Sequence, residues 1–509
     1  MTRRLHTQAV VVGGGPVGML VAAELARYGV RTVVLESQDQ VSVQPKGNTL
    51  HARTVQSLVR RGYLAPPVTA GAPVTRSFHF AGLPGLPITA PSAEPEPLLK
   101  RPQAELTRLF EERASAAGAQ VLRGHRVVRV GQGPDQVEVT AEGPDGPVTW
   151  VAEYLVGADG PRSLVREQAG IPSTTRPATV SALSGVVSLP DPQALTPGWH
   201  PGPRGWVVAS PMPEGTSYVR TLDCAGPAAD RHRPPTLAEL RQEVSRIVGR
   251  DIAMAQPHWL GRFSDFSRLA GTFRTGRILL AGDAAHVHFP IGGQGLSTGL
   301  LDAVNLGWKL ALTILGRVGP DLLDSYDLER RPAAQRVVDN SHAQLALMRP
   351  DPALDPLRAL FAELVAADGG SGLLSGLLSA QDTVFPAPTR KPSPREGTFL
   401  QNVRLTTQAG ETDVIGLLAQ GQPLLLLLGG EPERYQEQAQ GWAELVRVVH
   451  AAPTPDIPYE ALLVRPDGYL AWASDGDALS EALAAYFGPR PDLAAGGVGQ
   501  GGGLVRSLS

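Results

Sequence analysis

A GxGxxG pattern over residues 13–18 (GGGPVG) stands in a setting that few folds share. A β-branched run over 9–12 precedes the pattern, a helical pattern over 19–27 follows it, and a second strand-like run covers 31–35. A strand, a glycine turn, a helix and another strand make up the βαβ unit that binds dinucleotides. The start of the chain therefore predicts an α/β fold with a Rossmann-like domain.

Each of the three glycines in the pattern has a physical role. Gly13 permits the tight bend, Gly15 lets the backbone approach a pyrophosphate, and Gly18 lets the helix pack on the strand. The helix N-terminus offers free N–H groups and partial positive charge to the phosphates. Glu36 ends the second strand, where a carboxylate accepts hydrogen bonds from ribose hydroxyls and repels a 2′-phosphate. The unit suits FAD or NAD; the alternative is a glycine turn in a βα unit without a ligand.

A second motif lies far along the chain. Residues 277–286 (RILLAGDAAH) form a buried strand that delivers Asp283 at its C-terminal end, where open α/β sheets bind ligands. The segment 289–297 (FPIGGQGLS) then leads into a long helix. Its glycines, Gly292 to Gly295, and the helix dipole offer N–H groups to a developing anion. The alternative is a helix-capping loop without a ligand.

A third motif, 156–163 (VGADGPRS), follows a strand. Asp159 there can touch a cofactor or cap the next helix, and by itself the capping interpretation is favoured. His286 and His288 stand two apart with no third ligand nearby in the sequence, so we expect no metal site.

Composition excludes several classes of protein. The net charge of −3 and pI of about 6.4 give no sign of a nucleic-acid partner. The single cysteine, Cys224, excludes structural disulfides and CxxC chemistry. The longest apolar candidate, 296–315, carries three charged or amide residues, so we expect no membrane span. Arg3-Arg4 before an apolar stretch is not taken as an export signal, because cleavage would remove the βαβ unit, and the expected location is the cytoplasm.

At 509 residues the chain is long enough for about three domains. The pattern predicts a helix over 49–61 and a mostly irregular segment over 65–99 with a strand at 76–80. It also predicts a discontinuous dinucleotide-binding domain and an inserted sheet, followed by a Pro-rich linker at 385–394 and a small α/β domain. The expected bounds are 1–175 with 262–384, then 76–99 with 176–261, then 395–495, and finally a flexible tail over 496–509.

The three motifs in this order resemble those of the group A flavoprotein monooxygenases, which have the para-hydroxybenzoate hydroxylase fold. The resemblance covers roughly residues 8–345. The segment 463–472 (LVRPDGYLAW) is similar to the thioredoxin-like C-terminal domain of the aromatic polyketide hydroxylases, a subgroup that includes tailoring enzymes of antibiotic biosynthesis. The resemblance implies a Rossmann-like FAD-binding domain, an inserted β-sheet substrate domain and a thioredoxin-like α/β domain. Since Cys224 lies outside that last domain, we expect no thiol chemistry there.

The resemblance also assigns cofactor contacts. The pyrophosphate would lie at the glycine turn and at Lys46, where the family usually has arginine. Glu36 would hold the ribose, and Ser297 stands where asparagine is common. The complete predicted FAD set is Gly13, Gly15, Pro16, Gly18, Glu36, Lys46, Gln103, Val127, Asp159, Asp283, Pro290, Gly293, Gly295, Leu296 and Ser297.

The activity implied is hydroxylation of an aromatic, polyketide-like phenol. In the family, NADPH or NADH reduces FAD transiently, and O2 then gives a flavin C4a-hydroperoxide that transfers oxygen to the ring. We expect the substrate at the inserted sheet, with Arg204, Trp206, Tyr218 and Arg220 as candidate contacts; ordinary sheet packing is the alternative for each. The sequence names no catalytic base, and a homodimer is possible.

Other functions fit the same residues. Baeyer–Villiger or epoxidising oxygenation on this scaffold is the first alternative. A non-catalytic FAD-binding protein is the second, and the glycine cradle at 292–295 speaks against it.

Overall fold

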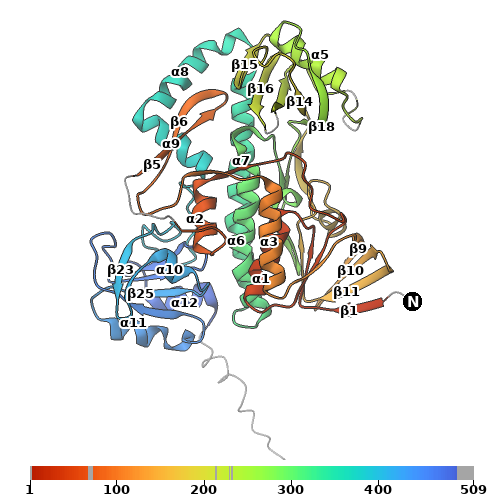
Figure 1. Ribbon diagram of the computed structural model, residues 1–509. Coiled ribbons are helices and arrows are strands. Elements are labelled where there is room, and N and C mark those ends of the chain that lie inside the picture. The colour runs from red at the N-terminus through yellow and green to blue at the C-terminus, as the bar shows by residue number, and fades with distance from the viewer. Residues whose placement is uncertain (1–2, 67–72, 213–214, 229, 231–232, 490–509) are drawn as a thin grey trace, which may run out of the picture. The chain divides into compact units, whose positions relative to one another are not determined.

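The computed structural model describes residues 3–66, 73–212, 215–228, 230 and 233–489, which fall into two compact units (Figure 1). The first unit comprises the described residues of Met1–Gln56, Pro67–Gly307 and Tyr326–Asp382. The second comprises Ser57–Pro66, Trp308–Ser325 and the described residues from Thr383 onward. The predicted tail over 496–509 lies outside the described residues. No helix in the described ranges is both long and apolar enough to cross a membrane.

The first unit is built on a six-stranded sheet of order β20-β21-β12-β2-β3-β8. The five strands from β21 to β8 run parallel, and β20 is an antiparallel edge. Strands β2, β3 and β12 are buried at every position, as in a parallel sheet covered on both faces. The α/β fold class is confirmed. The bounds are β2 (Ala9–Val12), β3 (Thr32–Leu35), β8 (Gln120–Leu122), β12 (Tyr154–Gly157), β20 (Arg274–Thr275), β21 (Ile278–Leu280), with helices α1 (Pro16–Arg27) and α3 (Gln103–Ala116).

Smaller sheets flank this core. A four-stranded sheet has the order β1-β11-β10-β9, and a three-stranded sheet has the order β13-β19-β22. Their bounds are β1 (Arg3–His6), β9 (Arg126–Gln132), β10 (Val137–Gly143), β11 (Gly146–Ala152), β13 (Ser173–Arg176), β19 (Ser267–Ala270) and β22 (His286–Val287), with α4 (Leu164–Gln168).

The predicted inserted sheet is present, with five antiparallel strands in the order β15-β16-β17-β14-β18. One face is apolar and packs on α5, with Val187, Val207 and Val219 in a shared core. The opposite face carries aromatic and basic side chains. The bounds are β14 (Ser181–Ser188), β15 (Gly198–Gly202), β16 (Gly205–Pro211), β17 (Thr216–Asp223), β18 (Ala255–Ser264) and α5 (Leu237–Val248).

The prediction that the segment 65–99 is mostly irregular is wrong. It contains a hairpin of β5 (Val74–Phe80) and β6 (Leu83–Ala90), which pair only with each other among the described strands. Two prolines in β6 argued against a strand, but a two-stranded sheet leaves one edge of each strand unpaired, and proline is tolerated there. The hairpin is therefore not hydrogen-bonded into the five-stranded sheet.

The helix predicted over 49–61 also begins late. Residues 49–51 form β4 (Thr49–His51), which pairs with β7 (Leu98–Lys100), and α2 (Ala52–Arg60) follows. A partner strand almost 50 residues away decides this start, which local periodicity does not reveal. The remaining helices are α6 (Gly295–Ile314), α7 (Asp324–Met348), α8 (Asp355–Ala366) and α9 (Asp368–Ser379).

The second unit contains a four-stranded mixed sheet of order β26-β25-β27-β28, in which only β25 and β26 are parallel. A two-stranded sheet, β23 with β24, adjoins it in sequence. The elements are β23 (Arg404–Thr407), β24 (Gly410–Asp413), α10 (Val414–Leu418), β25 (Leu424–Leu427), α11 (Pro432–Ala439), β26 (Arg447–His450), β27 (Ala461–Val464), β28 (Leu470–Ala473) and α12 (Leu479–Phe487).

Candidate functional site

The loops that follow three neighbouring parallel strands meet at one place. A methyl group added at Gly13, after β2, would lie 2.3 Å from the carbonyl oxygen of Ala158, after β12. One added at Gly282, after β21, would lie 3.1 Å from Val17. One added at Gly299 of α6 would lie 3.2 Å from the Gly282 Cα. The two distant glycine motifs therefore converge at the C-terminal edge of the sheet, where ligands bind in such folds.

The first glycine turn has the shape of a phosphate cradle. Gly13 has φ +105°, a conformation that favours glycine. A methyl group at Gly18 would lie 2.0 Å from the Gly13 carbonyl oxygen, so the helix approaches the turn at the closest distance glycine allows. By contrast, a methyl group at Gly15 would meet no protein atom within 4 Å. Space beside Gly15 and the N-terminus of α1 together fit a pyrophosphate.

Glu36 follows β3 and holds this turn in place. Its Oε2 accepts a hydrogen bond from the Gly14 N–H at 2.5 Å, and its Oε1 accepts one from the Gln38 N–H at 2.7 Å. The His125 N–H donates to the Glu36 carbonyl at 2.8 Å, which brings the strand of half-buried Val127 to the same edge. The carboxylate thus has a structural task in addition to the predicted ribose contact.

Asp283 lies in a short 3-10 turn directly after β21. Its side chain is exposed, although enough protein packs around the turn for burial to raise the pKa of its carboxyl. The positive charges of His286 and Lys46 oppose that shift in pKa. Lys46 is thereby placed near Asp283, as the predicted FAD set requires.

We expect Asp283→Ala to lose flavin while the protein stays folded. An exposed carboxylate has little to stabilise within the protein, whereas a hydrogen bond to a charged acceptor contributes about 1.5–3 kcal/mol to ligand binding. Flavin absorbance of the purified variant, and FAD titration of its apoprotein, measure the loss. Asp283→Asn is the matched control, since it keeps an acceptor of the same shape. Full flavin occupancy in Asp283→Ala contradicts the assignment.

A buried ionic network holds the turn that contains Asp283. The Asp302 carboxylate of α6 accepts hydrogen bonds from His286 Nε2 at 2.7 Å, from Arg330 Nε at 2.8 Å and from the Gly282 N–H at 3.1 Å. Arg330 also donates to the Thr298 carbonyl at 3.2 Å. Asp302, His286 and Arg330 are all buried. The network ties the Asp283 turn to the first turns of α6.

The N-terminus of α6 is presented by a rigid loop. Gly292 and Gly293 both have positive φ, at 76° and 65°, and Gln294 is buried with its amide bonded to Asn340 and to the Leu377 carbonyl. The Thr298 N–H bonds to the Gln294 carbonyl. The N–H groups before it, those of residues 295–297, are the helix-terminal donors.

The other members of the predicted FAD set have these places. The Ser297 side chain is buried and its Oγ accepts the His51 N–H at 3.1 Å, so only its backbone is available to a cofactor. Pro290 is exposed, Leu296 is half-buried, and Gln103 begins α3. Asp159 accepts hydrogen bonds from the Ser163 hydroxyl and the Val165 N–H at the start of α4, which is the capping arrangement.

Four side chains were predicted at the substrate sheet, and the structure separates them. Tyr218 and Arg220 share the face opposite α5 and are both half-buried. Trp206 is on that face too, but its ring packs in an apolar cluster and its Nε1 donates to the Met348 carbonyl at 2.7 Å. Arg204 lies outside β16 and forms an ion pair with Asp223 at 3.1 Å.

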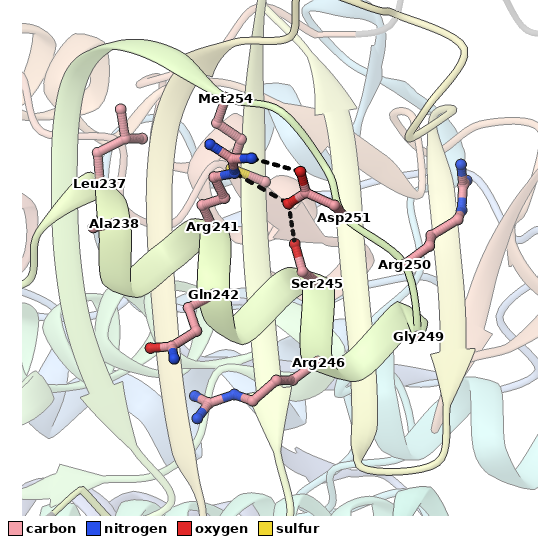
Figure 2. Close-up of a pocket in the computed structure, with 10 residues that line it drawn as sticks. All are labelled: Leu237, Ala238, Arg241, Gln242, Ser245, Arg246, Gly249, Arg250, Asp251 and Met254. Carbon is pink, nitrogen blue, oxygen red and sulfur yellow. Dashed lines mark hydrogen bonds and ion pairs between the residues drawn. The ribbon is translucent and has the colours of Figure 1, made fainter.

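Arg204 lines a cavity of about 470 Å³ beside α5, which is away from Tyr218 and Arg220. A second cavity, of about 700 Å³, also runs along α5 and is lined by Arg241, Ser245 and Asp251 (Figure 2). Figure 2 shows the Arg241 guanidinium turned toward the Asp251 carboxylate. Neither cavity includes a residue of the predicted FAD set, so both differ from the site at the strand ends.

Sequence reasoning missed the residues that support the site. Asp302 and Arg330 stand on two helices, and Gln294 was hidden within a glycine-rich loop. One signal was present: Asp302 is one of three charged or amide residues in the mostly apolar stretch 296–315. His51 lies in the segment predicted as a helix over 49–61, and His79 lies in the strand predicted at 76–80; neither was predicted as a site residue.

Comparison with known proteins identifies the family of both parts of the chain. Residues 6–341 match the FAD binding domain family, and residues 393–490 match the family of aromatic-ring hydroxylase C-terminal domains. The 12-dehydrotetracycline 5-monooxygenase/anhydrotetracycline 6-monooxygenase of Streptomyces rimosus is 37% identical over 505 residues, covering 95% of this chain and 99% of that protein. The dialkyldecalin synthase of Streptomyces rugosporus is 39% identical over 485 residues, covering 94% and 98%.

A solved structure agrees over the same length. The crystal structure of an aromatic hydroxylase from angucycline biosynthesis is 35% identical in sequence and superposes with a TM-score of 0.87. The match covers 95% of this chain and 99% of that one. The glycine cradle, the exposed Asp283 carboxylate and the free donors of α6 fit FAD. The chain therefore belongs to the group A flavoprotein monooxygenases and is an FAD-dependent aromatic monooxygenase.

Proposed function

We propose that this chain hydroxylates a polycyclic phenol of the aromatic polyketide type. Relatives named for tetracycline and angucycline substrates support the class of substrate. One observation carries the proposal. The sheet face that bears Tyr218 and Arg220 contacts the segment at Pro45, next to Lys46 of the predicted FAD set. The Tyr218 hydroxyl donates to the Pro45 carbonyl at 3.1 Å, next to Lys46.

FAD, reduced by NAD(P)H, supplies the oxygen-activating chemistry of this family when it is bound. The chain's own residues hold and orient it. We propose that Gly15 and α1 bind the pyrophosphate, Asp283 binds the ribityl end, and the N–H groups of residues 295–297 stabilise negative charge on the ring system. The network of Asp302 keeps these donors in register with Asp283.

The finer assignments follow from the same proposal. We infer the domain bounds given in the sequence analysis, with the inserted sheet as the substrate domain, except that residues 57–66 and 308–325 belong to the second unit. We also infer that the protein acts in the cytoplasm. The substrate contacts are narrowed to Tyr218 and Arg220, because Trp206 is packed and Arg204 lies beside α5.

The experiment is a turnover assay of the purified yellow protein with a panel of hydroxylated anthraquinones and tetracyclic phenols. NADH and NADPH oxidation, O2 uptake and product mass are followed together. We expect fast NAD(P)H oxidation only with a phenolic polycycle, and a product heavier by one oxygen atom on an intact ring. A ring-expanded product indicates the Baeyer–Villiger alternative. Conversion of an added polyene without NAD(P)H or O2 consumption indicates a cyclase, the activity for which the dialkyldecalin synthase relative is named.

A further inference from the structure

Within the described part of the first unit, two positive side chains have no acidic partner. They are Arg220 on β17 and Lys100 at the end of β7. Among the described residues, no carboxylate forms an ion pair or hydrogen bond with either one, whereas other arginines of the first unit, such as Arg204 and Arg330, are paired in that way. Arg220 is half-buried, and a cation in such a place usually has a counter-ion. Lys100 is exposed and adds a second positive charge.

The guanidinium of Arg220 has few hydrogen-bond partners within the protein. Its Nη2 reaches the Ser210 hydroxyl at only 3.4 Å, its Nε is buried without a partner, and its guanidinium lies 5.0 Å from the centroid of the Tyr218 ring. Burial lowers the pKa of Arg220, which shows the cost of keeping this charge away from water.

Lys100 adds a second charge to the same place. Its Nζ donates to the Thr49 hydroxyl at 2.6 Å and lies 5.6 Å from the centroid of the Phe78 ring. Burial, and then the charge of Arg220, lower the pKa of Lys100, although part of its side chain reaches solvent. Strand register also links the two cations: the Trp199 ring, 4.7 Å from that of His79, belongs to the residue paired with Val208, and Val208 is paired with Arg220.

The other titratable groups around the pair are neutral. Burial, Arg220 and Lys100 lower the pKa of His79 on β5 to about 4, and burial lowers that of His51 on β4 to about 4. Burial raises the pKa of the Tyr218 phenol on β17. At neutral pH the cluster of His51, His79, Lys100, Tyr218 and Arg220 therefore carries two positive charges and no negative one.

Aromatic rings border the cluster, and it is tied to the flavin loop. Phe78 and His79 stack with ring centroids 4.5 Å apart, and Trp199 lies 4.7 Å from His79. His51 Nε2 hydrogen-bonds to the Gly292 carbonyl at 2.8 Å, directly before the N-terminal turn of α6. A negatively charged aromatic molecule would complement the positive charges and the aromatic rings of this cluster.

We propose that Arg220 and Lys100 form an anion-binding site that holds an ionised oxygen of the aromatic substrate. The site selects polycycles with an acidic phenol or enol, which lose their proton to water and bind as the oxyanion. This inference rests on the proposed function and deepens it, because it states which member of the substrate class the chain accepts.

The experiment uses FAD-loaded protein and the coloured phenol alizarin, whose phenol and phenolate absorb at different wavelengths. The absorbance of bound alizarin is measured as a function of pH with wild type, R220Q, K100Q and R220K. R241Q is the matched control, because Arg241 is an exposed arginine paired with Asp251 beside α5. Alizarin dimethyl ether, which cannot ionise, reports the binding of the rings alone.

We expect wild type and R241Q to lower the pKa of bound alizarin by about one unit or more, which corresponds to about tenfold tighter binding of the anion. R220Q and K100Q should each return this pKa toward that of free alizarin, while R220K keeps most of the shift. The dimethyl ether should bind all five proteins alike. Flavin content of each variant confirms that it has folded.

Three outcomes overturn the proposal. They are wild type that binds alizarin no more tightly than its dimethyl ether, a bound pKa equal in wild type and both glutamine variants, and tighter binding of a hydroxyl-free anthraquinone carboxylate than of alizarin. Hydroxylation is measured separately. Turnover without anion selection removes only this inference, whereas anion selection without turnover removes only the proposed function.

Discussion

Gly18→Ala is expected to leave the purified protein without flavin. The added methyl group would lie 2.0 Å from the Gly13 carbonyl oxygen, and backbone cannot move aside as a flexible side chain can. Helix α1 must then shift away from the turn, at a cost of about 1–3 kcal/mol for overpacking. The shift also moves the N–H groups that face the phosphates. Flavin absorbance and the thermal unfolding midpoint of the apoprotein measure the two effects.

Gly15→Ala is the matched control for that variant. Its methyl group meets no protein atom within 4 Å, so the apoprotein should keep the unfolding free energy of wild type within about 0.5 kcal/mol. The methyl group would nevertheless occupy the space proposed for the pyrophosphate, and FAD affinity should fall. Full flavin content in Gly18→Ala, or equal apoprotein destabilisation by both changes, contradicts this account of the turn.

Asp302→Ala is expected to destabilise the first unit strongly. It leaves Arg330 and His286 buried without their carboxylate, and removing one partner of a buried ion pair costs about 3–5 kcal/mol. The Asp283 turn and α6 lose their common anchor, so flavin retention should fall with stability. Chemical denaturation and flavin content measure both. Normal flavin content with normal stability would show that the network is dispensable.

The pH dependence gives a second check on Asp302. Burial alone raises its pKa, but the charges of His286 and Arg330, and the hydrogen bonds from both, outweigh burial and lower it. A carboxyl with a depressed pKa stabilises the fold above its ordinary pKa, and this stabilisation is lost as the pH falls through the folded-state value. The difference in unfolding free energy between wild type and Asp302→Asn should therefore shrink below about pH 4. A difference that grows on acidification contradicts the direction.

The sequence predicts well wherever local chemistry decides. The βαβ unit, Asp283 after a buried strand and the long helix after the glycine loop all follow from short-range patterns, and the structure has them within a few residues. The strand predicted at 76–80 is present as β5, but its hairpin partner β6 was missed because the prolines of β6 are tolerated only on unpaired edges. The start of α2 was misplaced because β4 depends on a distant partner, β7. Trp206 and Arg204 could not be sorted by alternation alone, since packing and a turn decide where their side chains go.

The residues that support the site could not be predicted from local sequence patterns, for the same reason. Asp302, Arg330 and His286 acquire meaning only when two helices and a strand end meet. Lys100 and Arg220 are 120 residues apart, and their lack of acidic neighbours is a property of the folded chain.

The second unit is assembled from separate segments of the sequence, and this affects how such enzymes can be recombined. Trp308 Nε1 donates to the Asp467 carboxylate at 3.2 Å, and Arg60 donates to the Leu400 carbonyl at 3.0 Å, so sequence from within the amino-terminal two thirds completes this unit. A chimera spliced at the proline-rich linker would graft half of each such pair onto a foreign scaffold. Cassette exchange between homologues should succeed only when residues 57–66 and 308–325 travel with the carboxyl-terminal segment.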